Sequence, residues 1–263
     1  MTVLLIRAEI LKLTRQRGLF FFGFLLVPLF STFLSFALGG SVLPRDDGRA
    51  AIPLFHSLTR ALTIGGNPIA QLFFALGAAS IFTVDYRYSG WRHIVPRCKR
   101  AHLLGGKIAA YALFAGLSLV LVAAGDVSAN LIVALARGMK PVVTDMEIPY
   151  VFRSLLSFSI SFVELCALSG IVAAIATMTR SMMAAVLAPF LLSLVATSAE
   201  AYFGHAVAAV PLPTFAADAL RLGLGEAGPS PGAAMGALIL ASWCMVAFGL
   251  AIALFKRQDL VAE

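Results

Sequence analysis

The chain alternates between long apolar runs and shorter polar segments. A helix that crosses the hydrocarbon core of a bilayer needs about 20 residues. Six runs are close to this length or exceed it, and we expect each to be a membrane-spanning helix: residues 19–38, 64–84, 108–124 or beyond, 155–178, 182–202 and 233–255. The pattern therefore predicts an all-α, polytopic integral membrane protein with a single domain over residues 1–263.

Polar residues and prolines inside the runs predict local irregularities. Apolar character in the third run continues past Asp126, so this run is either one long tilted helix or a helix that breaks near Gly125. Asn67-Pro68 suits the start of the second helix, because proline is tolerated in a first turn. Pro189 lies inside the fifth run and should kink it.

The segment before the first span is amphipathic. Its apolar residues recur at helical spacing, which predicts an interfacial helix within residues 1–17; they are Val3, Ile6, Ile10 and Leu13. The alternative is a charged flank that only stops translocation.

The loop before the last span, residues 204–232, is expected on the extracytoplasmic side. Thr214 could cap a short interfacial or re-entrant helix that ends at Leu222, with Phe215, Ala219 and Leu222 on one face. A loop without regular structure is the alternative.

Composition excludes an ordinary soluble domain. The chain is 60% hydrophobic and 13% charged, whereas soluble domains are about 45–50% apolar and about 25% charged. The net charge of +7 comes from basic residues that flank the apolar runs. We therefore expect contact with membrane lipids and no nucleic-acid partner. With the N-terminus in the cytoplasm, most of the 20 lysine and arginine residues fall in cytoplasmic segments, which predicts that both termini are cytoplasmic.

No catalytic or metal-binding motif is present in the sequence. It contains no GxxxxGK[ST], HExxH or GxSxG pattern, so the chain has no P-loop of its own, and we expect neither a catalytic site nor a metal site. His93, Cys98 and His102 do not have the spacing of a known ligand set.

One carboxylate lies in the middle of a span. Placing Glu164 there costs about 2.5–3.5 kcal/mol unless it finds water or a partner. It should therefore face the bundle interior, with Ser161 and Leu168 on the same helical face. Two roles remain open: a functional site, or a hydrogen-bonded glutamate that locks helices together. Asp126 is a second candidate, expected near the outer interface.

The loop between the second and third spans, residues 85–107, is basic and aromatic. It carries Tyr86, Arg87, Trp91 and Arg92 on its first half. Such a segment could transmit force from a soluble partner; the alternative is a positive-inside loop without a partner.

Three motifs in order resemble the permease subunits of ABC-2-type exporters. They are Arg7-Ala8-Glu9-Ile10-Leu11-Lys12-Leu13 before the first span, then Gly90-Trp91-Arg92 with Pro96-Arg97, Arg100 and Lys107, and finally Phe255-Lys256-Arg257-Gln258-Asp259-Leu260. The tryptophan is similar to that of the bacteriocin-immunity and bacitracin-resistance branch. The family more often has a glutamate-rich stretch where this chain has Asp85-Tyr86-Arg87-Tyr88.

The resemblance implies a six-span permease of the bacterial inner membrane. It would act with two copies of a cytoplasmic ABC ATPase, which binds ATP and Mg²⁺, and with a second permease copy or paralogue; the chain itself would bind no cofactor. A cytoplasmic coupling helix would dock on the ATPase through Tyr86, Arg87, Gly90, Trp91, Arg92, Pro96, Arg97 and Arg100, with Glu9 and Lys12 beside it.

The substrate path is expected along the first, second and fifth spans. The candidate residues are Phe30, Phe33, Met183 and Phe190, with Glu164 and Asp126 as intramembrane polar groups. The cargo class stays open between amphipathic peptides, lipid-like molecules and drugs. Other hypotheses are an ion- or proton-coupled transporter that uses Glu164, and a scaffold or sensor that transports nothing.

Overall fold

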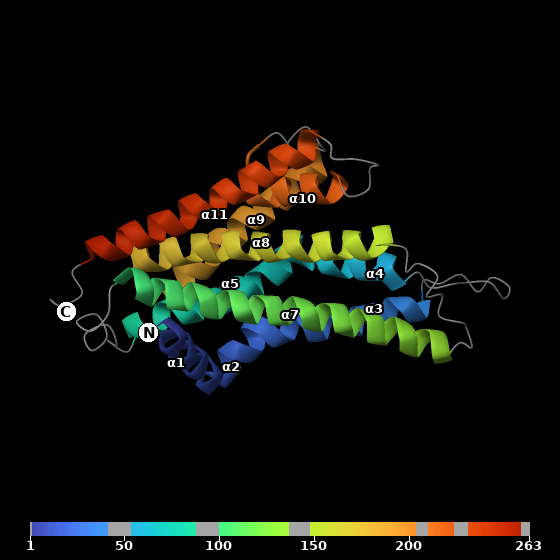
Figure 1. Ribbon diagram of the computed structural model, residues 1–263, viewed down its shortest axis with the longest axis horizontal. Helices are drawn as coiled ribbons and strands as arrows, with labels where there is room; N and C mark the ends of the chain where they lie inside the picture. The colour runs from blue at the N-terminus through green and yellow to red at the C-terminus, as the bar shows by residue number, and fades with distance from the viewer. Residues whose placement is uncertain are drawn as a thin grey trace.

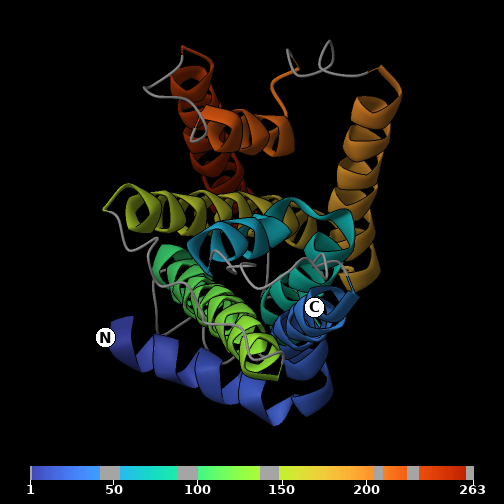
Figure 2. The same cartoon turned by 90° about the vertical axis from the view of Figure 1, so that its right-hand side faces the viewer.

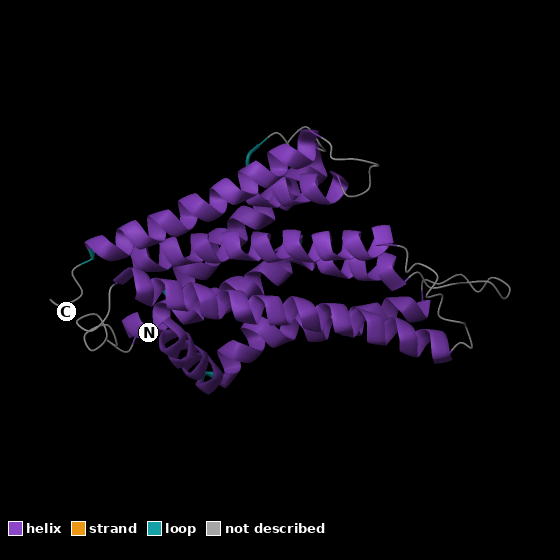
Figure 3. Ribbon diagram, in the orientation of Figure 1, coloured by secondary structure: helices purple, strands orange, loops and turns teal. Residues whose placement is uncertain are grey.

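The computed structural model describes residues 2–41, 54–87, 100–136, 148–203, 210–223 and 231–258. Every regular element in these ranges is a helix, as Figure 3 shows. Six helical segments are long and apolar enough to cross a membrane: Arg17–Ala37, Pro68–Arg87, Arg100–Ala136, Tyr150–Thr179, Met182–Phe203 and Gly232–Arg257. The prediction of an all-α, multi-pass membrane protein with six spans is confirmed.

The spans run side by side along the long axis of the molecule (Figure 1). In chain order they are α2 (Arg17–Phe20) with η1 (Phe21–Leu25) and α3 (Leu26–Ser41), then α5 (Pro68–Arg87), α7 (Arg100–Ala136), α8 (Ile148–Thr179), α9 (Met182–Phe203) and α11 (Pro231–Arg257). Helix α8 is central, because it packs against α5, α7, α9 and α11.

Helix α1 (Thr2–Arg15) lies obliquely across the bundle, beside the start of α7 (Figures 1 and 2). Its Leu13 is buried and Ile10 packs against the core, while Leu4 and Leu11 are exposed. One apolar face thus contacts the bundle and further apolar side chains remain outside, as an interfacial helix requires.

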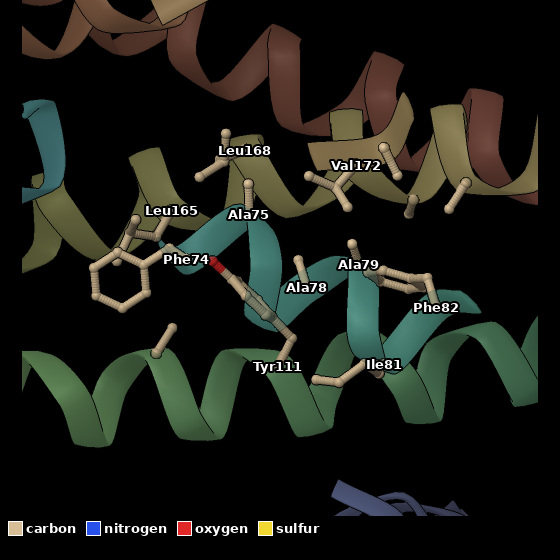
Figure 4. Close-up of a cluster of buried hydrophobic side chains, with 14 of the residues drawn as sticks. Phe74, Ala75, Ala78, Ala79, Ile81, Phe82, Tyr111, Leu165, Leu168 and Val172 are labelled. Atoms are coloured by element: carbon tan, nitrogen blue, oxygen red, sulfur yellow. The ribbon is translucent and has the colours of Figure 1, made fainter. Parts of the chain in front are cut away.

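Close packing of α5 against its neighbours depends on small residues. Figure 4 shows Ala75, Ala78 and Ala79 of α5 between larger side chains from α7 and α8, among them Tyr111 and Leu165. Small residues allow the backbones of membrane helices to approach each other. This packing makes α5 one of the most buried spans in the described bundle.

The first span contains a proline whose missing donor is replaced from another helix. Pro28 has no N–H, so the carbonyl of Phe24 loses its α-helical donor. The hydroxyl of Ser118 on α7 donates to that carbonyl instead. In a lipid environment such a substitute is needed, because no water is present to hydrogen-bond the backbone.

The third span is one continuous helix, α7, of 37 residues. This finding decides between the two alternatives for the third run. Gly125 is not a break; a Cβ there would collide with the side chain of Thr32, so the glycine allows α3 to approach α7 closely.

The second span is preceded by a broken helix that the sequence did not predict. Helix α4 (Leu54–Ala61) and the 3-10 helix η2 (Leu62–Gly66) come before α5, which begins after the extended residue Asn67. Side chains of α8 provide hydrogen bonds to carbonyls of this irregular segment. Ser157 donates to the carbonyl of Thr59 (3.2 Å). Ser161 donates to the carbonyl of Leu62. The expected start at residue 64 was therefore wrong, whereas the start at Asn67-Pro68 is confirmed.

The predicted short helix before the last span is present as α10 (Pro213–Gly223), packed against α8 and α11. The face formed by Phe215, Ala219 and Leu222 is buried only in part. The consecutive residues Phe215, Ala216 and Ala217 are buried, while Leu222 is 66% exposed. The reason is that two helices cover the first half of α10 from different sides.

The boundaries of the loop after α5 also differ from the expectation. Residues 85–87 belong to α5, and residues 100–107 belong to α7. The predicted coupling helix, with Gly90, Trp91, Arg92, Pro96 and Arg97, lies outside the described residues.

Candidate functional site

A buried polar cluster surrounds Glu164 in the middle of α8. The Glu164 side chain is 2% exposed, and its carboxylate forms an ion pair with Arg221 of α10. Gln71 of α5 donates to the same carboxylate (3.2 Å). Arg221 also forms an ion pair with Asp218 (2.7 Å) and donates to Ser161 (3.2 Å). We call Gln71, Ser161, Glu164, Asp218 and Arg221 the Glu164 cluster.

The broken helix makes space for this ion pair. A Cβ on Gly65 would lie 3.2 Å from a Glu164 carboxylate oxygen, and a Cβ on Gly66 would lie 2.7 Å from Nη1 of Arg221. The carbonyl of Gly65 accepts a hydrogen bond from Gln71 (2.8 Å). The glycine pair thus lies against both charged groups, and the irregular backbone is joined to the cluster.

Arg221 keeps its charge in this setting. Burial by itself lowers the pKa of the guanidinium, but the carboxylates of Glu164 and Asp218 outweigh it and hold the pKa above its ordinary value. The pocket beside the cluster has a volume of about 20 Å³ and includes Gln71, Glu164 and Ser193 in its lining. That volume suffices for about one water molecule. In this conformation the cluster joins α5, α8 and α10.

A second buried cluster joins α1 to α5 and α7. Lys12 lies 2.7 Å from Glu9 and 2.9 Å from Asp85. Lys107 lies 3.1 Å from Glu9 and 2.7 Å from Asp85. Lys107 also donates to the carbonyl of Ile81 (2.6 Å). Each carboxylate thus has two lysines and each lysine two carboxylates; we call these four residues the α1 ion-pair cluster.

The charges of the α1 ion-pair cluster support one another. Burial by itself lowers the pKa of Lys12, but Glu9 and Asp85 outweigh it, so the pKa lies above the ordinary value of 10.5. Lys107 is 1% exposed at its side chain. The free-energy cost of burying this ammonium group is offset because two carboxylates and a carbonyl surround it.

Two further predicted coupling residues contact the end of α11. The hydroxyl of Tyr86 donates to the side chain of Gln258 (2.7 Å). Arg100 donates to the carbonyls of Lys256 and Gln258, each at 2.7 Å. Arg100 therefore binds carbonyls of the last turn of α11 and of the residue after it, where a cation is favourable. Its proposed contact with an ATPase remains a prediction, as does that of the exposed Arg87.

Asp126 occupies a third polar cluster, between α3, α4 and α7. Its carboxylate accepts hydrogen bonds from Ser35 and Ser57, each at 2.8 Å, and from Asn130 (3.1 Å). The residue is 2% exposed. The expected position of Asp126 near the outer interface stays a prediction. What the structure adds is that the carboxylate is buried and that hydrogen bonds from three residues compensate its burial.

The structure does not bring the predicted substrate-path residues together. Phe30 lines a cavity between α3 and α5. Phe33 and Met183 are 66% and 69% exposed on different helices, and Phe190 is half-buried on α9. None of the four lines the pocket beside Glu164.

Sequence reasoning missed the main partner of Glu164. Arg221 was assigned to an extracytoplasmic loop, and no local pattern connects residues that are 57 positions apart. Gln71 lay inside an apolar run, where a lone amide is itself a signal of a buried polar contact. The pairing of Glu9 and Lys12 with Asp85 and Lys107 was also not foreseen, although all four are charged residues beside apolar runs.

The described structure thus defines an all-α, multi-pass membrane protein with buried ion pairs at two levels of its bundle. Comparison with known protein families and with curated proteins finds no match.

Proposed function

We propose that the chain is the membrane subunit of an ATP-driven exporter. It would act with two copies of a cytoplasmic ABC ATPase, which bind ATP and Mg²⁺, and with a second permease copy or paralogue. The support is the ordered set of motifs that resembles ABC-2-type permeases, together with the six-span architecture and the charged entry helix.

The observation that carries the proposal is the position of the α1 ion-pair cluster. Asp85 lies near the end of α5 and Lys107 near the start of α7, so both borders of residues 88–99 are bound to α1 through Glu9 and Lys12. A force applied to residues 88–99 by an ATPase would reach α1, α5 and α7 together. Helix α5 then leads to η2 and the Glu164 cluster at its other end.

We place the protein in the bacterial inner membrane with both termini in the cytoplasm. The excess of lysine and arginine on the side of the termini supports this orientation. The α1 end of the bundle is then the ATPase side, and α10 lies toward the outer side.

Purification of the full chain from its native host tests the partner. We expect a P-loop ATPase to co-purify, and substrate-stimulated ATP hydrolysis to fall when Trp91→Ala and Arg92→Ala are combined. Arg60→Ala, at an exposed basic residue of α4 outside the three motifs, is the matched control and should leave hydrolysis unchanged. Absence of any ATPase, together with substrate movement driven by a proton gradient alone, would contradict the proposal.

A further inference from the structure

A cavity of about 180 Å³ lies between α3 and the start of α5. Its floor is formed by buried residues, among them Val27, Ser31 and Ala70, which are 4%, 8% and 5% exposed. Its rim is formed by Phe30, Leu34 and Ile69, which are 59%, 43% and 63% exposed. The cavity is therefore a groove that opens on the outer surface of the bundle, where membrane helices meet lipid.

Two polar groups face this otherwise apolar groove. The hydroxyl of Ser31 makes no hydrogen bond with any described residue, although Ser31 is 8% exposed. Asn67 uses its side-chain oxygen to accept from the backbone N–H of Ile69 (2.9 Å), and its amide nitrogen has no partner among the described residues. An apolar pocket with a few unused hydrogen-bonding groups is typical of a ligand site. Neither group is charged, so the ligand is expected to offer uncharged oxygen acceptors.

The depth of the groove specifies those acceptors. Helix α5 has 20 residues between Pro68 and Arg87, so it is about 30 Å long, which equals the thickness of the hydrocarbon core. In a bilayer centred on α5, Asn67 would lie at the boundary opposite Arg87, where the ester groups of glycerolipids are found. Leu26 and Leu34 of the lining are about 12 Å apart along α3. The groove thus extends from this boundary into the acyl-chain region.

We propose that the groove binds one acyl chain of a membrane glycerolipid, with the ester carbonyls accepting hydrogen bonds from Asn67 and Ser31. The site goes beyond the exporter function and does not depend on it, because lipid binding needs neither ATP nor a partner subunit. Ile64 and Asn67 of the lining flank Gly65 and Gly66, which contact the Glu164 cluster. The bound chain would therefore contact Ile64 and Asn67, next to the two glycines that meet the ion pair.

Photolabelling of the full chain in lipid nanodiscs tests the proposal. The probe is a phosphatidylglycerol that carries a diazirine in the middle of one acyl chain. We expect the strongest labelling on peptides that contain Phe30, Leu34 or Ile69. Competition with unlabelled ester-linked phosphatidylglycerol should reduce the labelling. The ether-linked analogue, which has the same chains without carbonyls, should compete about 25-fold less well, as expected for loss of both hydrogen bonds.

Two variants and a control complete the test. Ser31→Ala should weaken labelling about fivefold, and Ser31→Leu, which also fills the floor, should abolish it. Leu250→Phe, on the exposed surface of α11, should change nothing. Thermal unfolding confirms that each variant is folded, and Ser31→Ala removes no hydrogen bond of the described structure. Equal labelling of all exposed helices, or equal competition by the ester and ether lipids, would overturn the proposal.

Discussion

The two buried ion-pair clusters differ in the ratio of carboxylates to basic groups and in the regularity of the backbone that carries them. The α1 ion-pair cluster has two carboxylates and two lysines, all on regular helices. The Glu164 cluster has one arginine between two carboxylates, beside the irregular segment η2. A balanced set of buried charges on regular helices fixes those helices together, whereas a buried set with an excess carboxylate costs less to separate. We therefore interpret the first cluster as a rigid joint and the second as a contact that can open.

Removal of Lys107 should have the largest effect on stability. Lys107→Met leaves Glu9 and Asp85 with one lysine in place of two, and loss of one partner from a buried pair costs about 3–5 kcal/mol. The measurement is the free energy of unfolding by SDS in mixed micelles. Lys256→Met, at an exposed lysine, is the control and should change it by less than about 0.5 kcal/mol. A loss below about 1 kcal/mol for Lys107→Met would mean that the cluster is not a rigid joint.

Removal of Arg221 should have a smaller effect, about 2 kcal/mol, because Gln71 still donates to Glu164. Glu164→Gln alone should preserve folding, since the amide keeps much of the hydrogen bonding. A double-mutant cycle with Arg221→Met and Glu164→Gln should give a coupling energy of about 1–3 kcal/mol. Additive effects of the two substitutions would show that the ion pair does not hold α10 to α8.

Unchanged transport in Glu164→Gln would favour the structural role of this glutamate, and lost transport in a folded variant would favour the functional one.

Gly66→Ala should destabilise the protein by about 1 kcal/mol, because the new Cβ meets Nη1 of Arg221 at 2.7 Å and the flexible guanidinium has to shift. In the Arg221→Met background this cost should disappear. Gly18→Ala is the matched control: no atom lies within 4 Å of its Cβ, so it should be neutral or stabilise α2 by up to about 1 kcal/mol. An equal loss of stability from Gly66→Ala in both backgrounds would show that the requirement for glycine does not depend on the ion pair.

The smallest effect concerns pH. The pKa of Lys12 is raised above 10.5 in the folded protein, so its contribution to stability is complete below 10.5 and is lost as the pH rises through the raised value. Unfolding midpoints measured from neutral to strongly alkaline pH should fall less steeply at the alkaline end in Lys12→Met than in the unmodified protein. The difference is expected to be small, because the Lys12 side chain is 31% exposed and partly screened.

Hydropathy was sufficient to predict the six spans, because each must supply an apolar surface of fixed length to lipid. It was not sufficient for the contacts that distinguish the two clusters. Hydropathy does not show the break at η2, because Leu62 and Ile64 are as apolar as the residues of a membrane helix. The residues that indicate a break are Gly65, Gly66 and Asn67-Pro68. The pairing of Glu164 with Arg221 depends on how α10 docks against α8, and that is a property of the assembled bundle.

The length of α7 has a mechanical consequence. Its 37 residues span about 55 Å, against about 30 Å of hydrocarbon. Lys107 fixes its beginning in the α1 ion-pair cluster, so the excess lies at the far end, where α7 extends beside α3, α4 and α8 (Figure 1). Hydrogen bonds of Asp126 and Asn130 join this far part of α7 to Ser35 of α3 and Ser57 of α4, so these helices would move together. A small tilt of the bundle at the α1 end would become a larger displacement at this far end, where an external probe could follow it.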